Sequence, residues 1–270
     1  MRIFVTGVGG QLGHDVMNEL AKRGYEGVGS DIAPSYSGIA DGTAVTTMPY
    51  VQMDITDKAS VEKVIKEANV DAVIHCAAWT AVDAAEDEEN QPKVRLVNVT
   101  GTQNIADVCK ELDIKMLYLS TDYVFDGQGT TPWEPDCKDY KPLNVYGQTK
   151  LDGELAVSGT VDKFFIVRIA WVFGKYGKNF IKTHDTLSVV NDQIGTPTYT
   201  YDLARLLVDM IKTEKYGYYH ATNEGGYISW YDFTKEIFRQ AAAMGHPEYL
   251  PENMTVNNCR VWRFQSSQTV

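Results

Sequence analysis

Cysteine is scarce in this sequence and forms no recognisable pattern. Only 4 of the 270 residues are cysteines, and no two of them make a C-x-x-C pair. We therefore expect incidental thiols in a reduced, cytoplasmic protein rather than a disulfide framework. The 5 histidines show no H-E-x-x-H or similar ligand spacing, so we predict no metal site. The cysteines are Cys76, Cys109, Cys137 and Cys259.

Long apolar runs and excess positive charge are also missing. No run reaches the length of about 18 apolar residues that a membrane-spanning helix needs. The first apolar run meets glycine at Gly7, too early for the apolar core of a signal peptide, and we expect no secretory leader. The formal net charge of −11 argues against nucleic acid or an anionic membrane as a partner. An anionic substrate would need Lys or Arg placed locally.

Strand-like and helical runs alternate along most of the chain, which is typical of a parallel sheet with helices on both faces. We predict a Rossmann-type, doubly wound α/β domain over residues 1–170. A small C-terminal α/β substrate lobe, interleaved with it, would follow over 171–270. Expected strands are 2–6, 25–31, 50–53, 71–76, 116–119 and 164–169, with helices at 12–20, 58–68, 90–112 and around 146–150. The lobe would hold strands 187–190 and 218–221, helix 201–213 and a helix opened by a capping box at 229–232.

Three glycines in a G-x-x-G-x-x-G pattern lie between the first strand and the first helix. Glycine permits the tight turn and lets the diphosphate of a dinucleotide approach the backbone amides at a helix N-terminus. Asp31 ends the second strand, where a carboxylate binds the adenosine ribose. Its charge opposes the 2′-phosphate of NADPH and favours NADH. The glycines are Gly7, Gly10 and Gly13.

Other strand ends supply further candidates for the cofactor site. Asp54 would bind the adenine amine, or else cap the following helix. Ala77 and Ala78 are small enough to lie beside flat cofactor groups. Asn98 stands inside a helix, where Asn is mildly unfavourable, and this suggests a side-chain role in the site. The acidic run at 83–89 is typical of a solvated helix start.

A hydroxyl, a phenol and an ammonium follow the strand at 116–119. Thr121 comes at the end of that strand, and Tyr146 and Lys150 lie four residues apart on one helix face. With a hydride carrier nearby, these groups form a site for carbonyl reduction or alcohol oxidation. The spacing alone is weak evidence, because Tyr231 and Lys235 repeat it in a run that we interpret as an ordinary helix face.

Several segments together resemble the extended short-chain dehydrogenase/reductases, and among them the family of dTDP-4-dehydrorhamnose reductases. The likeness covers roughly residues 1–235. The chain departs from the family at 181–186, which is shorter, and after 251, where no helical or strand period is found. We therefore expect an incomplete substrate lobe with a poorly ordered tail over 251–270. The matching segments are the glycine pattern, 54–57, 76–83, 98–102, 120–127, 146–150 and 170–174.

The resemblance implies roles for individual residues. Thr121, Tyr146 and Lys150 would be catalytic, and Tyr146 and Lys150 would also hold the cofactor. The segments 191–193 and 195–198 would help to build the nucleotide-sugar side. Trp171 would face the sugar or, alternatively, fill the core. The implied cofactor residues also include Gln11, Leu12 and Ile55, and the implied substrate residues are Thr80, Val82, Asp83, Thr121 and Trp171.

The implied activity is reduction of the 4-keto group of a dTDP-deoxysugar by NADH or NADPH. Two other functions stay open: a non-catalytic dinucleotide-binding subunit, similar to the regulatory β subunit of methionine adenosyltransferase, and a sugar-nucleotide epimerase or dehydratase. The intact trio argues against the first. The resemblance also implies a homodimer, in some members formed through magnesium, for which we identify no ligands in this sequence.

Overall fold

Seven parallel strands form the main sheet of the computed structural model, which describes residues 1–38, 47–128, 130–175, 186–246 and 255–259. The strand order is β11-β6-β5-β4-β1-β2-β3. The last six are in the order of a doubly wound Rossmann sheet, so the predicted fold class is confirmed. The strands are β1 (Arg2–Thr6), β2 (Glu26–Asp31), β3 (Tyr50–Gln52), β4 (Ala72–His75), β5 (Lys115–Thr121), β6 (Phe164–Ile169) and β11 (Gly217–His220).

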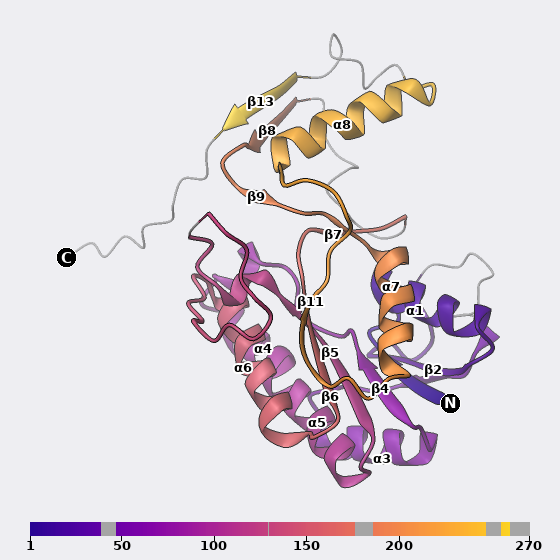
Figure 1. Ribbon diagram of the computed structural model, residues 1–270. Coiled ribbons are helices and arrows are strands. Elements are labelled where there is room, and N and C mark those ends of the chain that lie inside the picture. The colour runs from indigo at the N-terminus through magenta and orange to yellow at the C-terminus, as the bar shows by residue number, and fades with distance from the viewer. Residues whose placement is uncertain (39–46, 129, 176–185, 247–254, 260–270) are drawn as a thin grey trace. The chain divides into compact units, whose positions relative to one another are not determined.

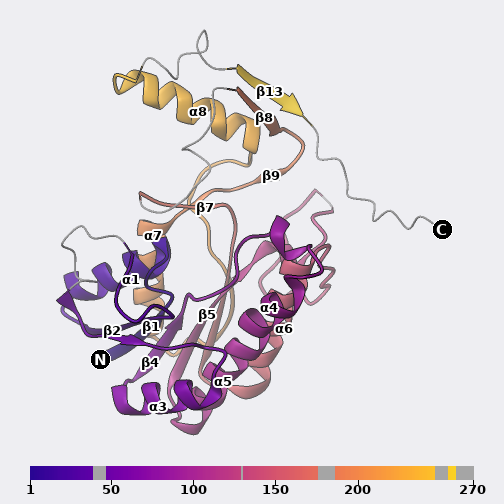
Figure 2. The ribbon, with the colours of Figure 1, turned by 180° about the vertical axis from the view of Figure 1, so that it is seen from behind.

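Helices cover both faces of this sheet (Figures 1 and 2). Successive strand side chains point to opposite faces, and the core is divided accordingly. Ile3 and Val5 pack with α1 and α7, whereas Phe4 packs with α3 and α5. The helices are α1 (Gln11–Lys22), α3 (Lys58–Ala68), α4 (Gln91–Arg95), α5 (Thr102–Glu111), α6 (Val145–Thr160) and α7 (Thr200–Ile211), and a π-helical segment (Leu96–Gly101) joins α4 to α5.

The chain divides into two compact units, one of residues 1–177 with 198–222 and one of 178–197 with 223–270. The first unit therefore contains α7 and β11, which we expected in the substrate lobe, and that expectation is wrong. β11 adds to the sheet by pairing with β6 in parallel. A parallel neighbour needs a crossover helix, and α7 supplies it by burying Leu203, Leu207 and Val208 beside α1. The predicted domain boundary after residue 170 stays a prediction.

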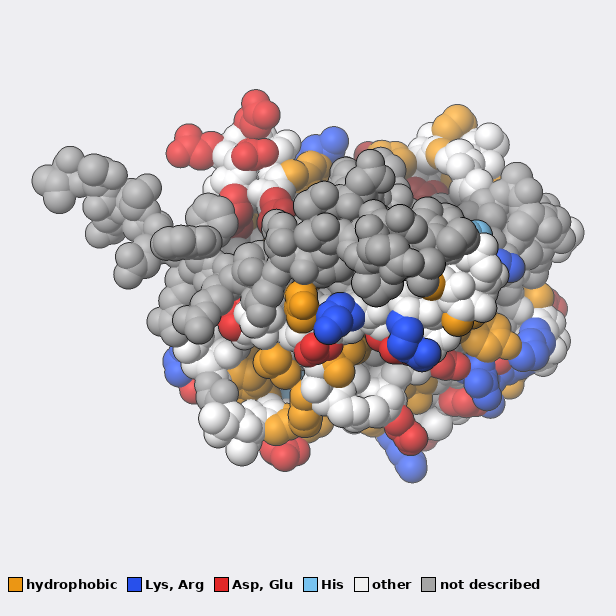
Figure 3. All heavy atoms as spheres, turned by 90° about the horizontal axis from the view of Figure 1, so that it is seen from above, with side chains coloured by type: hydrophobic (Ala, Val, Ile, Leu, Met, Phe, Trp, Pro, Cys, Tyr) orange, Lys and Arg blue, Asp and Glu red, His pale blue; other side chains and the backbone are white. Residues whose placement is uncertain are grey.

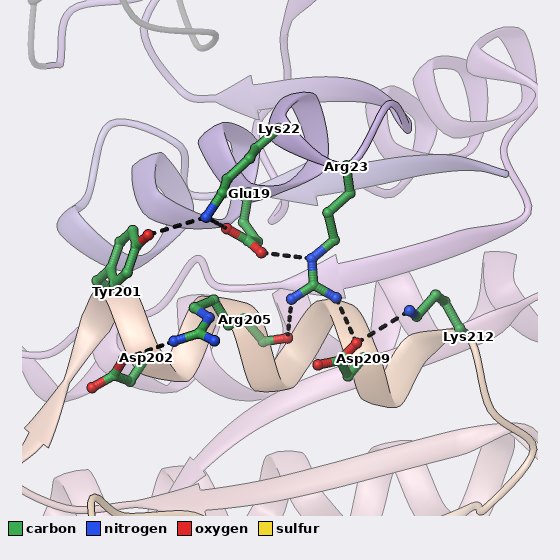
Figure 4. Close-up of polar contacts among 8 residues, drawn as sticks. All are labelled: Glu19, Lys22, Arg23, Tyr201, Asp202, Arg205, Asp209 and Lys212. Atoms are coloured by element: carbon green, nitrogen blue, oxygen red, sulfur yellow. Dashed lines mark hydrogen bonds and ion pairs between the residues drawn. The ribbon is translucent and has the colours of Figure 1, made fainter.

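Polar contacts add to the packing of α7 on α1 (Figure 4). Arg23, just after α1, donates to Glu19 and to Asp209 of α7. Lys22 donates to the Tyr201 hydroxyl at 3.2 Å. The contacts of Lys22 with Tyr201 and of Arg23 with Asp209 lie at the surface and each adds little stability, whereas the Glu19 carboxylate is buried. The apolar seam provides most of the stability.

In its described residues, the second unit carries short strand pairs and one helix. β8 (Thr186–Val190) pairs in parallel with β13 (Thr255–Cys259), and β9 (Ile194–Gly195) pairs antiparallel with β12 (Ile228–Ser229). α8 (Trp230–Ala243) begins at the predicted capping box of Ser229 and Asp232. Residues 251–270 show no strand period in the sequence, yet β13 forms at 255–259. Ladder pairing uses backbone groups, so β13 forms without an alternating side-chain pattern.

Within the described residues, no helix is both long and apolar enough to cross a membrane. On the face seen in Figure 3, acidic side chains stand at several places with Lys and Arg between them. The short parallel pair of β7 (Val172–Phe173) and β10 (Thr198–Tyr199) completes the first unit.

A buried ion pair ties the sheet to α6. Arg168 on β6 donates from Nε and Nη2 to the two carboxylate oxygens of Glu154 on α6, both at 2.8 Å. Its remaining donors reach the Pro135 carbonyl and the Tyr140 hydroxyl in the preceding loop. The two charged side chains are only 1% and 0% exposed. The pair therefore fixes α6 and this loop against the sheet.

Removing one partner of this pair should be costly, because the other charge stays buried. We expect Arg168→Met to lower the free energy of unfolding by about 3 to 5 kcal/mol. Urea denaturation followed by circular dichroism measures the change. Arg205→Met, which breaks the exposed pair with Asp202, is the matched control and should cost less than about 1 kcal/mol. Equal effects of the two substitutions would contradict this role of Arg168.

Candidate active site

The candidate site lies at the carboxyl edge of the sheet, because parallel strands all end there. β1 leads into the glycine loop, β2 ends at Asp31, β5 ends at Thr121, and Trp171 follows β6. In open α/β sheets this edge is where ligands bind. The structure thus brings strand ends that are far apart in sequence to one edge.

The glycine loop needs glycine at two positions in particular. Gly7 has φ +71°, and a Cβ there would lie 2.7 Å from the Ala77 nitrogen. A Cβ on Gly13 would lie 2.3 Å from the Gly7 carbonyl oxygen, so α1 can approach the loop only with glycine there. Gly10 is the N-cap of α1, and no side chain in the described part of the chain caps this end. The amides of Gln11, Leu12 and Gly13 are therefore left for an anionic ligand.

Asp31 binds the glycine loop directly. One of its carboxylate oxygens accepts from the Gly9 amide at 2.9 Å, and the other accepts from the Ile32 amide at 2.8 Å. Each oxygen keeps a second lone pair. Asp31 can therefore hold the loop and still accept hydrogen bonds from a ribose.

The next two strand ends carry the other predicted cofactor residues. Asp54 accepts from the Thr56 amide and hydroxyl, at 2.8 and 2.7 Å, while Asp57 caps α3. Asp54 is thus not the helix cap. Ile55 is buried in the core, and its carbonyl accepts from Asn104 at 2.9 Å. Ala77 and Ala78, after β4, are half-buried.

Thr121 and Tyr146 face each other across the start of α6. Thr121 is buried, donates to Asp122 at 3.0 Å and accepts from the Tyr123 amide at 3.2 Å. Burial raises the pKa of Tyr146, Asp122 raises it further, and a hydrogen bond with Thr121 opposes the rise. The phenol is therefore protonated at neutral pH and can donate a proton.

The first turn of α6 is held by contacts from several parts of the chain. Its N-cap Asn144 accepts from the Gly147 amide at 2.6 Å. Glu86 accepts from the Val145 amide at 2.7 Å. A Cβ on Gly147 would lie 2.4 Å from the Tyr123 carbonyl oxygen, so α6 docks closely on the turn after β5. Tyr146 thereby has a defined position.

Lys150 is buried one turn further along α6, with 3% of its surface exposed. Burial lowers its pKa to about 7, and the nearby Glu154 opposes that change. Among the described residues, none accepts a hydrogen bond from its ammonium group. A buried ammonium without an acceptor is suited to a ligand that brings one, such as a ribose hydroxyl.

A buried hydrogen-bond chain runs beneath these groups, beginning at Thr6. The Thr6 hydroxyl oxygen accepts from the amides of Cys76 and Ala77, both at 3.1 Å. Both of its lone pairs are then used, so its proton goes to Nδ1 of His75 at 2.8 Å. His75 must therefore carry its proton on Nε2, which donates to Thr102 at 3.3 Å. Burial and Lys150 lower the pKa of His75 to about 3, in agreement with a neutral ring.

The chain continues into the π-helical segment and α6. The Thr102 hydroxyl donates to the Asn98 carbonyl at 2.7 Å. The Asn98 side chain donates to Thr149 at 3.1 Å, and Thr149 donates to the Tyr146 carbonyl at 2.9 Å. Asn98 also accepts from the Trp79 amide at 2.8 Å. The chain thus links the end of β1 to the backbone of Tyr146.

The predicted substrate residues occupy less buried positions. Thr80 and Asp83 are exposed, and Val82 is half-buried. Trp171 is half-buried and has φ +49°, a left-handed conformation that is unfavourable for a bulky side chain. Such strain is concentrated at functional sites. Residues 191–193 and 195–197 belong to the second unit, and residues 181–185 lie outside the described part of the chain.

Sequence reasoning missed the positioning residues. Glu86 and His75 act through contacts with residues that are distant in sequence, and no local pattern marks them. Asn98 was found through its unfavourable place inside a helix, and in the structure it lies in the π-helical segment, a feature frequent at functional sites.

The residues fit a dinucleotide. The uncapped end of α1, the free lone pairs of Asp31 and the Lys150 ammonium all lack the partner that such a ligand supplies. Gln11 Oε1 and Thr200 Oγ1 are also buried without a partner in the described residues, and both lie against Gly174. Within the same residues, no group of His, Cys, Asp or Glu could hold a metal ion.

Comparison with known proteins identifies the family. The RmlD substrate binding domain family matches residues 1–268. A dTDP-4-dehydrorhamnose reductase of Aggregatibacter actinomycetemcomitans is 36% identical over 264 residues, which cover 93% of this chain and 82% of that protein. A dTDP-4-keto-6-deoxy-D-glucose reductase of Streptomyces niveus is 36% identical over 250 residues, covering 90% and 79%.

The crystal structure of a dTDP-4-dehydrorhamnose reductase from Bacillus anthracis, in complex with NADP, has a TM-score of 0.80 at 34% identity. The match covers 96% of this chain and 84% of that one. The fold is that of the short-chain dehydrogenase/reductases. The chain belongs to the RmlD substrate-binding-domain family, and the resemblance predicted from the sequence is confirmed.

The neutral state of His75 predicts a specific dependence of stability on pH. An unfolded His takes up a proton near pH 6.5, whereas folded His75 does so only near pH 3. Between these values the unfolded state binds more protons, so stability falls as the pH falls. From pH 7 to pH 5 this group should cost about 2 kcal/mol.

Urea denaturation at both pH values tests this. In His75→Gln the difference between pH 7 and pH 5 should be smaller than in the wild type by that amount. His246→Gln, at an exposed position, should keep the wild-type difference. An unchanged difference in His75→Gln would show that His75 is not held neutral.

Proposed function

We propose that this protein is a NAD(P)H-dependent reductase of the 4-keto group of a dTDP-deoxysugar, and that it forms dTDP-rhamnose from dTDP-4-dehydrorhamnose. The observation that carries the proposal is the trio of Thr121, protonated Tyr146 and buried Lys150 beside a glycine loop. Family membership supplies the substrate class, since relatives that are 36% identical carry reductase names with dTDP-4-keto sugars.

Each residue of the trio has a separate task. Tyr146 donates its phenolic proton to the oxygen that develops negative charge as the ketone is reduced. Thr121, whose hydroxyl donates to Asp122 in the protein without ligands, would turn this one proton to the same oxygen and stabilise its charge. Lys150 holds the nicotinamide ribose, and its positive charge eases release of the phenolic proton. The dinucleotide, when bound, supplies the hydride.

The pH dependence follows from these protonation states. The Lys150 ammonium is needed in its charged form, and its pKa is about 7 in the protein without ligands. Tyr146 stays protonated well above that. Loss of activity with rising pH should therefore be due to Lys150 rather than to the phenol.

Asp31 supports NADH as the preferred cofactor, because its charge opposes a 2′-phosphate. The relative from Bacillus anthracis binds NADP, so the family does not exclude the phosphorylated cofactor. Placement in the cytoplasm, homodimerisation (in some family members through magnesium) and weak binding of the nucleotide sugar by a shortened lobe stay predictions.

The alternatives differ in the fate of the cofactor. A reductase consumes NADH in proportion to product, whereas an epimerase or dehydratase recycles it and a regulatory subunit leaves it unchanged. Absorbance at 340 nm with dTDP-4-dehydrorhamnose and with dTDP-4-keto-6-deoxy-D-glucose distinguishes them. Stoichiometric loss of NADH or NADPH with either sugar supports the reductase, and no loss with both contradicts it.

Tyr146→Phe removes only the proton donor. We expect cofactor affinity to stay within a few-fold and turnover to fall by about 10² to 10⁴. Steady-state kinetics and fluorescence titration with NADH measure the two effects. Tyr231→Phe, in the second Tyr-x-x-x-Lys pair, is the matched control and should leave turnover unchanged. Wild-type turnover in Tyr146→Phe would exclude it as the proton donor.

Asp31→Ala has two consequences that can be separated. Loss of the bond to the Gly9 amide loosens the loop and weakens both cofactors. Loss of the negative charge favours NADPH alone, so the ratio of kcat/KM for NADPH to that for NADH should rise at least about tenfold, the effect of 1.4 kcal/mol. If both efficiencies fall equally, Asp31 anchors the loop without contacting the ribose.

A further inference from the structure

Lys150 lies directly over an aromatic ring that has no place in the mechanism above. Its Nζ is 4.1 Å from the ring centroid of Tyr118 on β5. Tyr118 is fully buried. A cation within about 6 Å of an aromatic face is attracted to it, most strongly where water is excluded. With no hydrogen-bond acceptor from the described residues, the ammonium has this ring as its close neighbour.

Three contacts fix the ring of Tyr118 from different sides. The His75 ring stacks on it with centroids 5.9 Å apart. Its hydroxyl donates to the backbone carbonyl of Lys150 at 3.3 Å. A Cβ on Gly153 would lie 2.3 Å from this hydroxyl, so α6 leaves room for it only because residue 153 is glycine. Tyr118 therefore holds both the backbone and the ammonium of Lys150.

We propose that Tyr118 is a positioning residue that holds the ammonium of Lys150 in the active site, in its charged form, through the face of its ring. This inference rests on the proposed function, because it assigns Tyr118 a task in the same reaction. It adds a residue that touches neither substrate nor cofactor and acts only through Lys150.

The other titratable groups around Lys150 define what the ring must contribute. Glu154 and Tyr146 lie on its own helix, and His75 and Cys76 lie at the end of β4. Burial raises the pKa of the Cys76 thiol to about 12, so this group is neutral, as is His75. Glu154 is the negative charge of this set, and Arg168 already binds both of its oxygens. The negative charge of Glu154 therefore acts on both Arg168 and Lys150. The ring of Tyr118 supplies further attraction for the Lys150 ammonium alone.

The test compares rings of one shape at position 118. Tyr118→Phe removes the hydroxyl and keeps the negative ring face. Pentafluorophenylalanine, introduced at the same position by amber suppression, keeps the shape and reverses the charge of the face. The pKa of Lys150 is measured by NMR of lysine labelled with ¹³C at Cε, and Lys150→Arg assigns the signal.

We expect Tyr118→Phe to leave the pKa of Lys150 within about 0.3 of wild type, and the fluorinated ring to lower it by about 1 relative to Phe. Tyr118→Leu, which removes the ring face without reversing its charge, should lower the pKa of Lys150 by less than the fluorinated ring does. Equal pKa values for Lys150 with the Phe and the fluorinated ring would overturn the proposal. Because the two rings have the same shape, a general packing defect would not produce a difference between them.

Kinetics separate this inference from the proposed function. In an active reductase, the fall of kcat/KM with rising pH should move to lower pH by the same amount in the fluorinated variant. The NMR measurement needs no substrate. If the wild type is inactive but the pKa of Lys150 differs between the Phe and the fluorinated variant, the positioning role is upheld and the reductase is rejected. If the wild type is active but the pKa of Lys150 is the same in the two variants, the reductase is upheld and the positioning role is rejected.

Discussion

The hydroxyl of Thr6 makes the contact on which the site depends most. Its two lone pairs and its proton are all used, and this fixes the tautomer of His75 and the direction of the hydrogen bond from His75 to Thr102. Since the chain passes from β1 through the end of β4 to α6, it sets the positions of these three elements together. A chain of buried polar groups is stable only when each member has its hydrogen-bond partners. At Thr6 and His75 the contacts allow only one assignment of the protons.

Local sequence was sufficient for the parts of the site that are built locally. The glycine pattern lies within one turn between strand and helix, and Tyr146 and Lys150 share one helix face. Both could be predicted because spacing along the chain determines their geometry. Gly7 lies against the backbone that follows β4, and Gly13 lies against the backbone of the glycine loop itself.

Other parts of the site and the fold could not be predicted, because they depend on contacts with residues that are distant in sequence. Tyr118 is one apolar residue in a buried strand, and only the approach of α6 gives it a role. Glu86 belongs to an acidic run that suggested solvent, but it reaches the amide of Val145. β11 and β13 were placed wrongly or missed, because strand partners depend on crossover paths and free edges rather than on side-chain pattern.

Trp171 has a backbone conformation that Asn69 and Asp113 also adopt elsewhere in the chain. Asn and Asp tolerate it, since their short polar side chains bond locally, whereas a bulky side chain such as tryptophan is rarely found in it. Glycine is the residue that would relieve the strain, and glycine has no ring. If Trp171 faces the sugar, as the family resemblance implies, selection for stability and selection for an aromatic group at the site act in opposite directions at this one position. A library screened only for thermal resistance should discard the tryptophan, and a library screened for turnover should keep it.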